Sequence, residues 1–118
     1  MEAHADIQAG ICGFLTHVTA SAQRARLVSF TFDTDCETVA ALAAALTEHG
    51  AFDAFDEIDP RTEGSLLPIV RTQLKGCCAG CAVPVGAFKA MQVAAGLALP
   101  KEIEIGLSLD RTIKPQER

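Results

Sequence analysis

The sequence contains no tryptophan and no tyrosine, which limits what a binding pocket could be made of. Such a pocket lacks the aromatic walls on which bases commonly stack. The ten basic residues are scattered, the net charge is −5 and the isoelectric point is near 5.0. Because binding to a phosphate backbone relies on clustered Lys and Arg, we expect no nucleic-acid partner.

Targeting signals are also lacking. The first ten residues, "MEAHADIQAG", have neither a basic n-region nor an apolar h-region, so we expect no signal peptide. No apolar run reaches the length of a membrane span, so we expect a cytoplasmic protein without a membrane partner. The length of 118 residues predicts a single domain over 1–118, with an ordered core over about 7–110 and a polar tail over 111–118.

The hydrophobic pattern predicts an α+β fold. Residues 7–20 and 26–33 read as two strands of a β-hairpin, and the alternating stretch "EIEIGLSLD" over 102–110 reads as a last strand. Two long helices lie between them, and the stretch "IVRTQL" is either a short helix or a strand. The order β-β-α-(α)-α-β predicts a small, largely antiparallel three-stranded sheet with helices packed on one face. Its open edges also allow a homodimer.

Boundary signals place the two long helices. The first begins at "TDCE", where Thr34 and Glu37 have capping-box spacing and Asp35 is an alternative N-cap, and it ends at Gly50. The second carries Pro84 in its first turn and ends at Gly96. Its expected buried stripe consists of Val85, Phe88, Met91 and Ala95.

Five cysteines stand out against these absences. In a reducing compartment they are poorly explained as structural disulfides, and metal binding or catalysis is the better interpretation. Cys12 falls in the first predicted strand beside Gly10 and Gly13, and Cys36 falls in the first turn of the first helix. Cys78 and Cys81 form a C-x-x-C at the start of the second long helix, where a helix N-terminus stabilises a thiolate. Cys77, the neighbour of Cys78, is expected to be the spare thiol, which takes no part in the site.

The spacing of the four cysteines favours a cofactor held by a folded domain. A zinc ribbon would need two C-x-x-C knuckles, and only one is present. Four soft thiolates suit an iron–sulfur cluster best, with a four-iron cluster favoured, and tetrahedral zinc next. We therefore expect Cys12, Cys36, Cys78 and Cys81 to be metal ligands in a binding or carrier protein rather than an enzyme, acting with a protein partner.

Other interpretations of the same residues stay open. Cys12 or Cys36 alone is more typical of a small core residue, because free cysteine is often buried. The C-x-x-C could serve a thiol–disulfide redox protein, although the βαβ pattern of thioredoxin-like proteins is missing. A plain interaction domain with buried cysteines is the remaining alternative.

The remaining titratable residues carry weaker signals. His4, His17 and His49 are far apart in the sequence, and none is expected to be a ligand. The acidic run "DAFDEID" lacks the spacing and central glycine of a calcium loop, so we expect a solvated acidic face.

Four motifs together carry a resemblance that covers about residues 7–109. "GICGF", "DCE", C-x-x-C-x-V-P and "GLALP" resemble a small family of uncharacterised bacterial and archaeal proteins. In that family the third motif reads His-x-x-Cys-Pro-Val-Pro, so Cys78 stands here in place of the histidine and Ala82 in place of the first proline. The exchange of imidazole for thiolate keeps a metal-ligating group at this position.

The order and separation of the cysteines also resemble iron–sulfur scaffold proteins of the IscU/NifU type. Those proteins place one cysteine after a strand and one at each of two helix starts. The resemblance implies a cluster-carrying role. It is incomplete, because Gly13 and Phe14 follow Cys12 where the scaffolds have an aspartate nearby.

Overall fold

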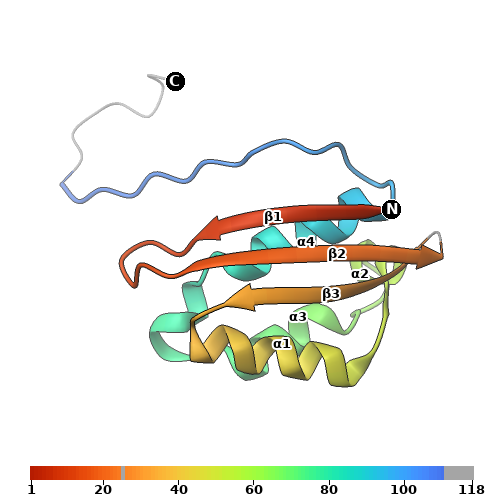
Figure 1. Ribbon diagram of the computed structural model, residues 1–118, viewed down its shortest axis with the longest axis horizontal. Helices are drawn as coiled ribbons and strands as arrows, with labels where there is room; N and C mark the ends of the chain where they lie inside the picture. The colour runs from red at the N-terminus through yellow and green to blue at the C-terminus, as the bar shows by residue number, and fades with distance from the viewer. Residues whose placement is uncertain (25, 111–118) are drawn as a thin grey trace.

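The computed structural model describes residues 1–24 and 26–110, and it shows an antiparallel sheet with helices on one face (Figure 1). The sheet has the strand order β1-β2-β3-β4, and each strand is antiparallel to its neighbours. The strands span Glu2–Gln8 (β1), Leu15–Arg24 (β2), Leu27–Thr34 (β3) and Phe52–Asp53 (β4). The predicted α+β class is therefore confirmed, with four strands in the sheet.

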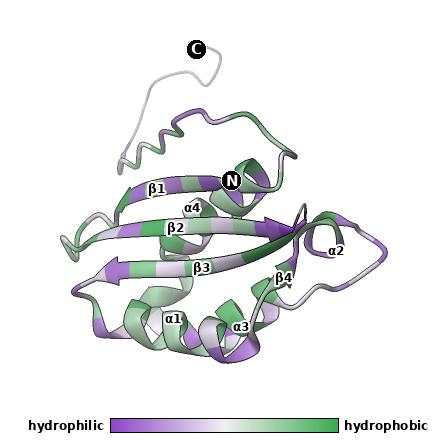
Figure 2. Ribbon diagram, turned by 45° about the vertical axis from the view of Figure 1, so that its right-hand side comes forward, coloured by the Kyte–Doolittle hydropathy of each residue, from purple (hydrophilic) through white to green (hydrophobic). Residues whose placement is uncertain are grey.

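The helical layer covers one face of this sheet. Its members are α1 (Glu37–His49), α2 (Ala54–Ile58), α3 (Leu66–Gln73), the 3-10 helix η1 (Gly76–Gly80) and α4 (Val83–Ala94). Helix α4 packs against β1 and β2, whereas α1 packs against β3 and α3. Figure 2 shows α1 below β3 and α4 behind the strands, both largely in hydrophobic colours. The stretch Gly76–Ala94 is long and apolar enough for a membrane span by composition alone, but here it comprises η1 and the core helix α4.

Strand β2 shows how the alternating pattern builds the core. Thr16, Val18 and Ala20 are at most 1% exposed and face the helices, whereas His17 and Thr19 lie on the open face. The Thr16 hydroxyl is buried, but it hydrogen-bonds to the Thr34 hydroxyl of β3 at 2.8 Å. This buried polar group is therefore satisfied, as the cost of burying an unpaired hydroxyl requires.

The predicted first strand over 7–20 is in fact two strands joined by a turn. Gly10 and Gly13 adopt φ values of 98° and 78°, which L residues with a side chain rarely adopt. The Gly13 N–H donates to the Gly10 carbonyl at 2.8 Å and closes the turn. The glycines that were expected to interrupt one strand therefore end β1 and begin the approach to β2.

The helices settle one open alternative and differ from the expectation in two details. The capping box of Thr34 and Glu37 is wrong, because Cys36 is the N-cap of α1 and its side chain makes no capping bond. The "IVRTQL" stretch is helical, and α3 begins early enough to include Pro68. In α4 the buried stripe is Val83, Gly86, Ala87, Ala90, Met91 and Ala94, so of the predicted stripe only Met91 is fully buried, and Val85 is 44% exposed.

The prediction of a last strand over 102–110 is wrong for the single chain that the structure describes. No strand is assigned to residues 102–110, which the structure does describe, and the segment runs alongside β1 without joining the sheet (Figure 1). Ile103, Ile105, Leu107 and Leu109 are 48%, 68%, 92% and 88% exposed. The predicted polar tail over 111–118 lies outside the described residues.

Candidate metal centre

Three segments that are distant in the sequence meet at one end of the sheet (Figure 1). They are the turn between β1 and β2, the start of α1, and the connection from α3 to α4 that contains η1. Each of these segments carries at least one cysteine. The fold thus gathers the cysteine-bearing boundaries at one end of the molecule.

Cys12 lies at the tip of the β1–β2 turn, and not within a strand as predicted. It stands between Ile11 and Gly13, and its side chain is exposed. The Ala9 N–H donates to the Phe14 carbonyl at 3.0 Å below the turn, which continues the hairpin ladder up to it. The turn therefore presents the Cys12 thiol to solvent at the end of a regular hairpin.

Cys36 lies where β3 passes into α1, as predicted for a helix start. Its carbonyl accepts the first helical bond, from the Ala40 N–H at 2.8 Å. Its own N–H donates to the Thr34 hydroxyl at 3.1 Å, and that hydroxyl also contacts Thr16. The pair of threonines thereby fixes the backbone of Cys36, which is half-buried.

The C-x-x-C lies on η1 and at its end. Cys77 and Cys78 are within the 3-10 helix, and Cys81 is its C-cap, followed by Ala82, the N-cap of α4. The Cys78 N–H donates to the Lys75 carbonyl and the Cys81 N–H donates to the Cys78 carbonyl, both at 3.1 Å. Cys77 is exposed, whereas Cys78 and Cys81 are half-buried and pack against the core. That Cys77 is the spare thiol stays a prediction.

The surroundings of Cys81 raise the pKa of its thiol. Burial raises the pKa of its thiol above the ordinary value of 9.0, and the Val83 backbone N–H, which hydrogen-bonds to the thiol, opposes that shift. The pKa is raised further by the charges that Cys12, Cys78 and Cys36 would carry as thiolates, in that order of effect. This effect agrees with the placement of the cysteine-bearing segments at one end of the sheet.

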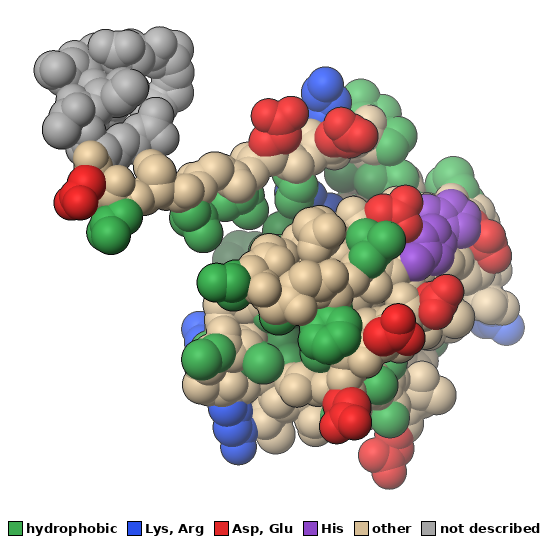
Figure 3. All heavy atoms as spheres, turned by 60° about the vertical axis from the view of Figure 1, so that its left-hand side comes forward, with side chains coloured by type: hydrophobic (Ala, Val, Ile, Leu, Met, Phe, Trp, Pro, Cys, Tyr) green, Lys and Arg blue, Asp and Glu red, His purple; other side chains and the backbone are tan. Residues whose placement is uncertain are grey.

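The side chains of this neighbourhood are not in a coordinating arrangement. Among residues 1–24 and 26–110, no group of three or more His, Cys, Asp and Glu side chains is placed to hold a metal ion. Figure 3 brings this end of the molecule forward and shows hydrophobic side chains, a class that includes cysteine, gathered on it. The structure therefore brings the cysteine-bearing segments to one end of the sheet, whereas coordination would require the thiols to move together.

The histidines lie elsewhere. His4 and His17 stack across β1 and β2 on the open face, with ring centroids 5.2 Å apart and 3.2 Å between His4 Nδ1 and His17 Nε2. The other ring nitrogen of His17 is 2.6 Å from Asp6 Oδ1. His49 stacks on Phe52 with centroids 4.1 Å apart. Each histidine therefore has ring or hydrogen-bond contacts within the protein.

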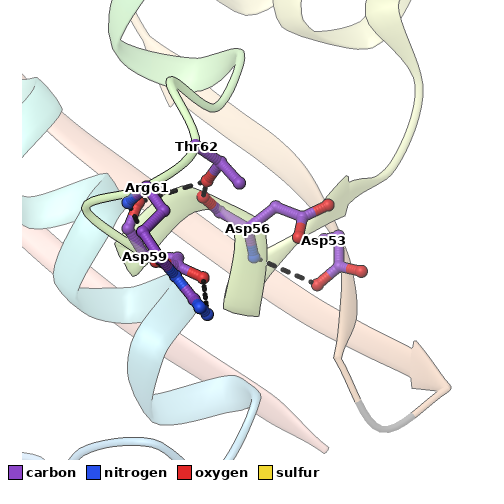
Figure 4. A network of polar contacts seen from close by, with 5 residues as sticks. All are labelled: Asp53, Asp56, Asp59, Arg61 and Thr62. Atoms are coloured by element: carbon purple, nitrogen blue, oxygen red, sulfur yellow. Dashed lines mark hydrogen bonds and ion pairs between the residues drawn. The ribbon is translucent and has the colours of Figure 1, made fainter.

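The acidic run is explained by local structure (Figure 4). Asp53 caps α2 by accepting hydrogen bonds from the Phe55 and Asp56 N–H groups, at 2.9 and 3.4 Å. It also pairs with Arg26, which lowers the pKa of the Asp53 carboxyl. Asp59 pairs with Arg61 at 3.0 Å, and this hydrogen bond lowers the pKa of the Asp59 carboxyl.

Sequence reasoning missed the groups that support the cysteines. The Thr16–Thr34 hydroxyl pair depends on strand register, which no local motif reveals. The Val83 N–H could have been foreseen, because the first N–H groups of any helix lack helical partners and Cys81 lies just before Ala82, the N-cap of α4.

One protein family matches nearly the whole chain, including all five cysteines. The chain belongs to the family described as "Family of unknown function (DUF6951)", whose model matches residues 3–107. No curated protein and no solved structure matches the chain.

Proposed function

We propose that this protein carries an iron–sulfur cluster, of the four-iron type, on Cys12, Cys36, Cys78 and Cys81. The observation that supports this proposal is that the three segments that carry these cysteines meet at one end of the sheet. The electrostatic effect of the other three cysteines on Cys81 agrees with that placement. Buried cysteines that served only as packing would not need to converge from three element boundaries.

The donor set fits the group by its chemistry. Cluster iron is held by thiolates, and four thiolates complete the ligand set of a four-iron cluster. Burial raises the pKa of the Cys81 thiol, and loading a cluster onto its thiolate would release a proton. The turn that holds Cys12 and the short η1 that holds Cys78 are the segments best able to move the thiols together, because each is a connection rather than a long element.

The groups around the thiols also suit a cluster. The Val83 N–H already hydrogen-bonds to the Cys81 sulfur, and such bonds tune the potential of a bound cluster. The Thr16–Thr34 pair holds the Cys36 backbone in place. When bound, a cluster would supply one-electron chemistry or transferable iron and sulfur, while the protein supplies its ligands and its partial shielding from water.

The surroundings of Cys12 suit a role in delivery to a protein partner. Ile11 is fully exposed beside Cys12, Phe14 is 37% exposed and Leu15 is 59% exposed. Apolar side chains gathered on a surface are typical of a site that a partner covers. We therefore propose electron transfer or delivery of a cluster or sulfur to a protein that docks over this turn, inside the cytoplasm. The resemblance to IscU/NifU-type scaffolds in cysteine order supports delivery as a proposal only.

Zinc is the second candidate, because the same four thiolates would suit a tetrahedral structural or regulatory zinc site. A thiol–disulfide redox role for Cys78 and Cys81 is the third. The thiolate is the nucleophile in such a reaction, so the raised pKa of Cys81 disfavours Cys81 as the attacking thiol.

The deciding experiment measures iron, acid-labile sulfide and zinc in protein purified without oxygen and without chelator. A cluster predicts near-equal iron and sulfide with a broad visible absorbance, whereas zinc alone would favour the second candidate. Cys36→Ser should lose the cluster, and Cys77→Ser, the matched control on the exposed neighbouring thiol, should keep it. Full cluster occupancy in Cys36→Ser would contradict the four-ligand scheme, and a metal-free protein would contradict both metal proposals.

A further inference from the structure

The segment over residues 102–110 alternates apolar and polar side chains as a half-buried strand does, yet it joins no sheet in the described chain. Its four large aliphatic residues, Ile103, Ile105, Leu107 and Leu109, are between 48% and 92% exposed. Figures 1 and 2 both show the segment running beside β1 and separate from it. The family match extends to residue 107, so most of this segment belongs to the shared domain rather than to a variable tail.

Strand β1 supplies the complementary feature, which is an open sheet edge. It pairs with β2 on one side, and the structure assigns no strand to its other side within residues 1–24 and 26–110. Met1 exchanges hydrogen bonds with Ala22, and Ala9 donates to Phe14, so the odd-numbered residues of β1 point their backbone groups toward β2. In an antiparallel ladder the alternate residues point the other way, so the N–H groups of Glu2, His4, Asp6 and Gln8 face the open edge.

We propose that residues 102–109 add as a strand to the open β1 edge of a second copy of this chain. Each copy then donates one strand and accepts one, so the arrangement closes as a two-fold dimer. The exchange covers the open edge of β1 with a strand. It also buries the aliphatic side chains of residues 102–109 over the helical face of the other copy. A second copy is the natural occupant, since the single chain leaves its own edge open although the segment lies beside it.

The acceptor edge can be tested with the full chain under reducing conditions, which prevent disulfide links between copies. Sedimentation equilibrium of the native chain should show a monomer–dimer transition between micromolar and submillimolar concentrations. Asp6→Pro removes the outward N–H, and proline is tolerated at such an edge position. It should weaken dimerisation by about tenfold or more. Asp6→Ala is the matched control, because it loses the same contact with His17 but keeps the N–H, and it should dimerise like the native chain.

The donor strand needs its own pair of variants. Ile105→Lys places a charge on the side expected to be buried, and Glu104→Lys places the same charge on the neighbouring polar side. Only Ile105→Lys should weaken the dimer. Circular dichroism of each variant separates a folded monomer from a chain that has lost its fold.

Three results would overturn the proposal. One is a native chain that stays monomeric at every concentration, and slow amide exchange over 102–109 in that monomer would assign the segment to its own β1 edge. Another is a dimer that survives both Asp6→Pro and Ile105→Lys, which would place the interface elsewhere. The third is a dimer that Ile105→Lys dissociates and Asp6→Pro leaves intact, which would pair the two segments with each other.

Discussion

Gly86 of α4 lies directly against Ile7 of β1. A β-carbon built at Gly86 would be 2.6 Å from Ile7 Cγ1 and 2.7 Å from Ile7 Cδ1, which is closer than atoms in contact can come. Ile7 is branched at its β-carbon and therefore stiff, so it cannot easily turn away. The absence of a side chain at Gly86 thus sets how closely the helix that follows the C-x-x-C approaches the strand that leads to Cys12.

We expect Gly86→Ala to destabilise the protein by about 1–3 kcal/mol, because the added methyl group overpacks this contact. The free energy of unfolding from urea titration measures the effect. The double variant Ile7→Ala with Gly86→Ala provides the control. In the Ile7→Ala background, Gly86→Ala should cost less unfolding free energy than it does in the native chain, because the clashing Ile7 atoms are gone. Equal costs in the two backgrounds would show that the contact does not limit the packing of α4.

The reactivity of the cysteines should follow their environment. Burial, the largest cause, raises the pKa of Cys81, so less of this thiol is thiolate at neutral pH than its ordinary value of 9.0 implies. We expect iodoacetamide to alkylate the exposed residues Cys12 and Cys77 first and Cys81 last in metal-free protein, as peptide mass spectrometry would show. Early labelling of Cys81 would contradict a buried, protonated thiol.

The same shift makes a prediction for stability at alkaline pH. A thiol whose pKa is raised by folding favours the protonated folded state, and its contribution is lost as pH rises from 9.0 through the raised value. Native protein should therefore lose more stability over this range than Cys81→Ala, in metal-free samples. Parallel stability curves for the two proteins would show that Cys81 does not titrate with a raised pKa.

The fold class and the helix positions could be predicted because local signals and packing agree there. Gly50 and Gly96 end helices with φ values of 94° and 78°, and Pro84 stands in the first turn of α4. The turn at Cys12 was missed because β-branched residues on both sides of Gly10 and Gly13 look like one long strand. The segment 102–110 has a strand pattern, but pattern alone does not say which edge, or which copy of the chain, it pairs with.

The candidate site was predictable only as a set of residue types. Cysteines at element boundaries could be read from the sequence, whereas their convergence on Cys81 depends on tertiary structure. The hydroxyl pair of Thr16 and Thr34 follows from the register of β2 and β3, which fixes them opposite each other. Such long-range pairings carry no local signal, so the supporting groups emerged only from the structure.

Asp53 joins two roles that substitution can separate. Its carboxylate caps α2 and pairs with Arg26, and the Arg26 hydrogen bond lowers the pKa of Asp53 below 3.8. A lowered pKa contributes stability above the ordinary carboxyl value, and that contribution is lost as pH falls through the lowered value. Asp53→Asn keeps a capping oxygen but loses the ion pair, so its stability deficit should shrink as the solution is acidified.

The measurement is the difference in unfolding free energy between native protein and Asp53→Asn from neutral pH to below 3.8. Asp53→Ala, which removes the cap as well, should cost about 1 kcal/mol more than Asp53→Asn at neutral pH. In an Arg26→Gln background the acid dependence of the difference should shrink, because the Arg26 hydrogen bond is the largest cause of the lowered pKa and the capping N–H groups supply the rest. An undiminished acid dependence there would assign the lowered pKa to the cap alone.

Glu57 of α2 holds the start of α3. Its two carboxylate oxygens accept hydrogen bonds from the Ser65 N–H at 2.8 Å and the Leu66 N–H at 2.9 Å. Leu66 is 1% exposed and anchors α3 in the core, and α3 leads directly into the segment that carries Cys78 and Cys81. Glu57→Ala leaves two N–H groups without the carboxylate, so we expect a loss of about 1–3 kcal/mol in unfolding free energy.

Two comparisons make this prediction specific. Glu57→Gln keeps one acceptor oxygen and should cost less than Glu57→Ala, whereas Glu63→Ala, a nearby exposed loop acid, should cost almost nothing. Metal content per folded chain should stay unchanged in Glu57→Ala, because the carboxylate stabilises α3 without being one of the proposed ligands. A Glu57→Ala variant that keeps its stability but loses metal would contradict this prediction. It would mean that Glu57 acts on the metal site directly and not through the stability of α3.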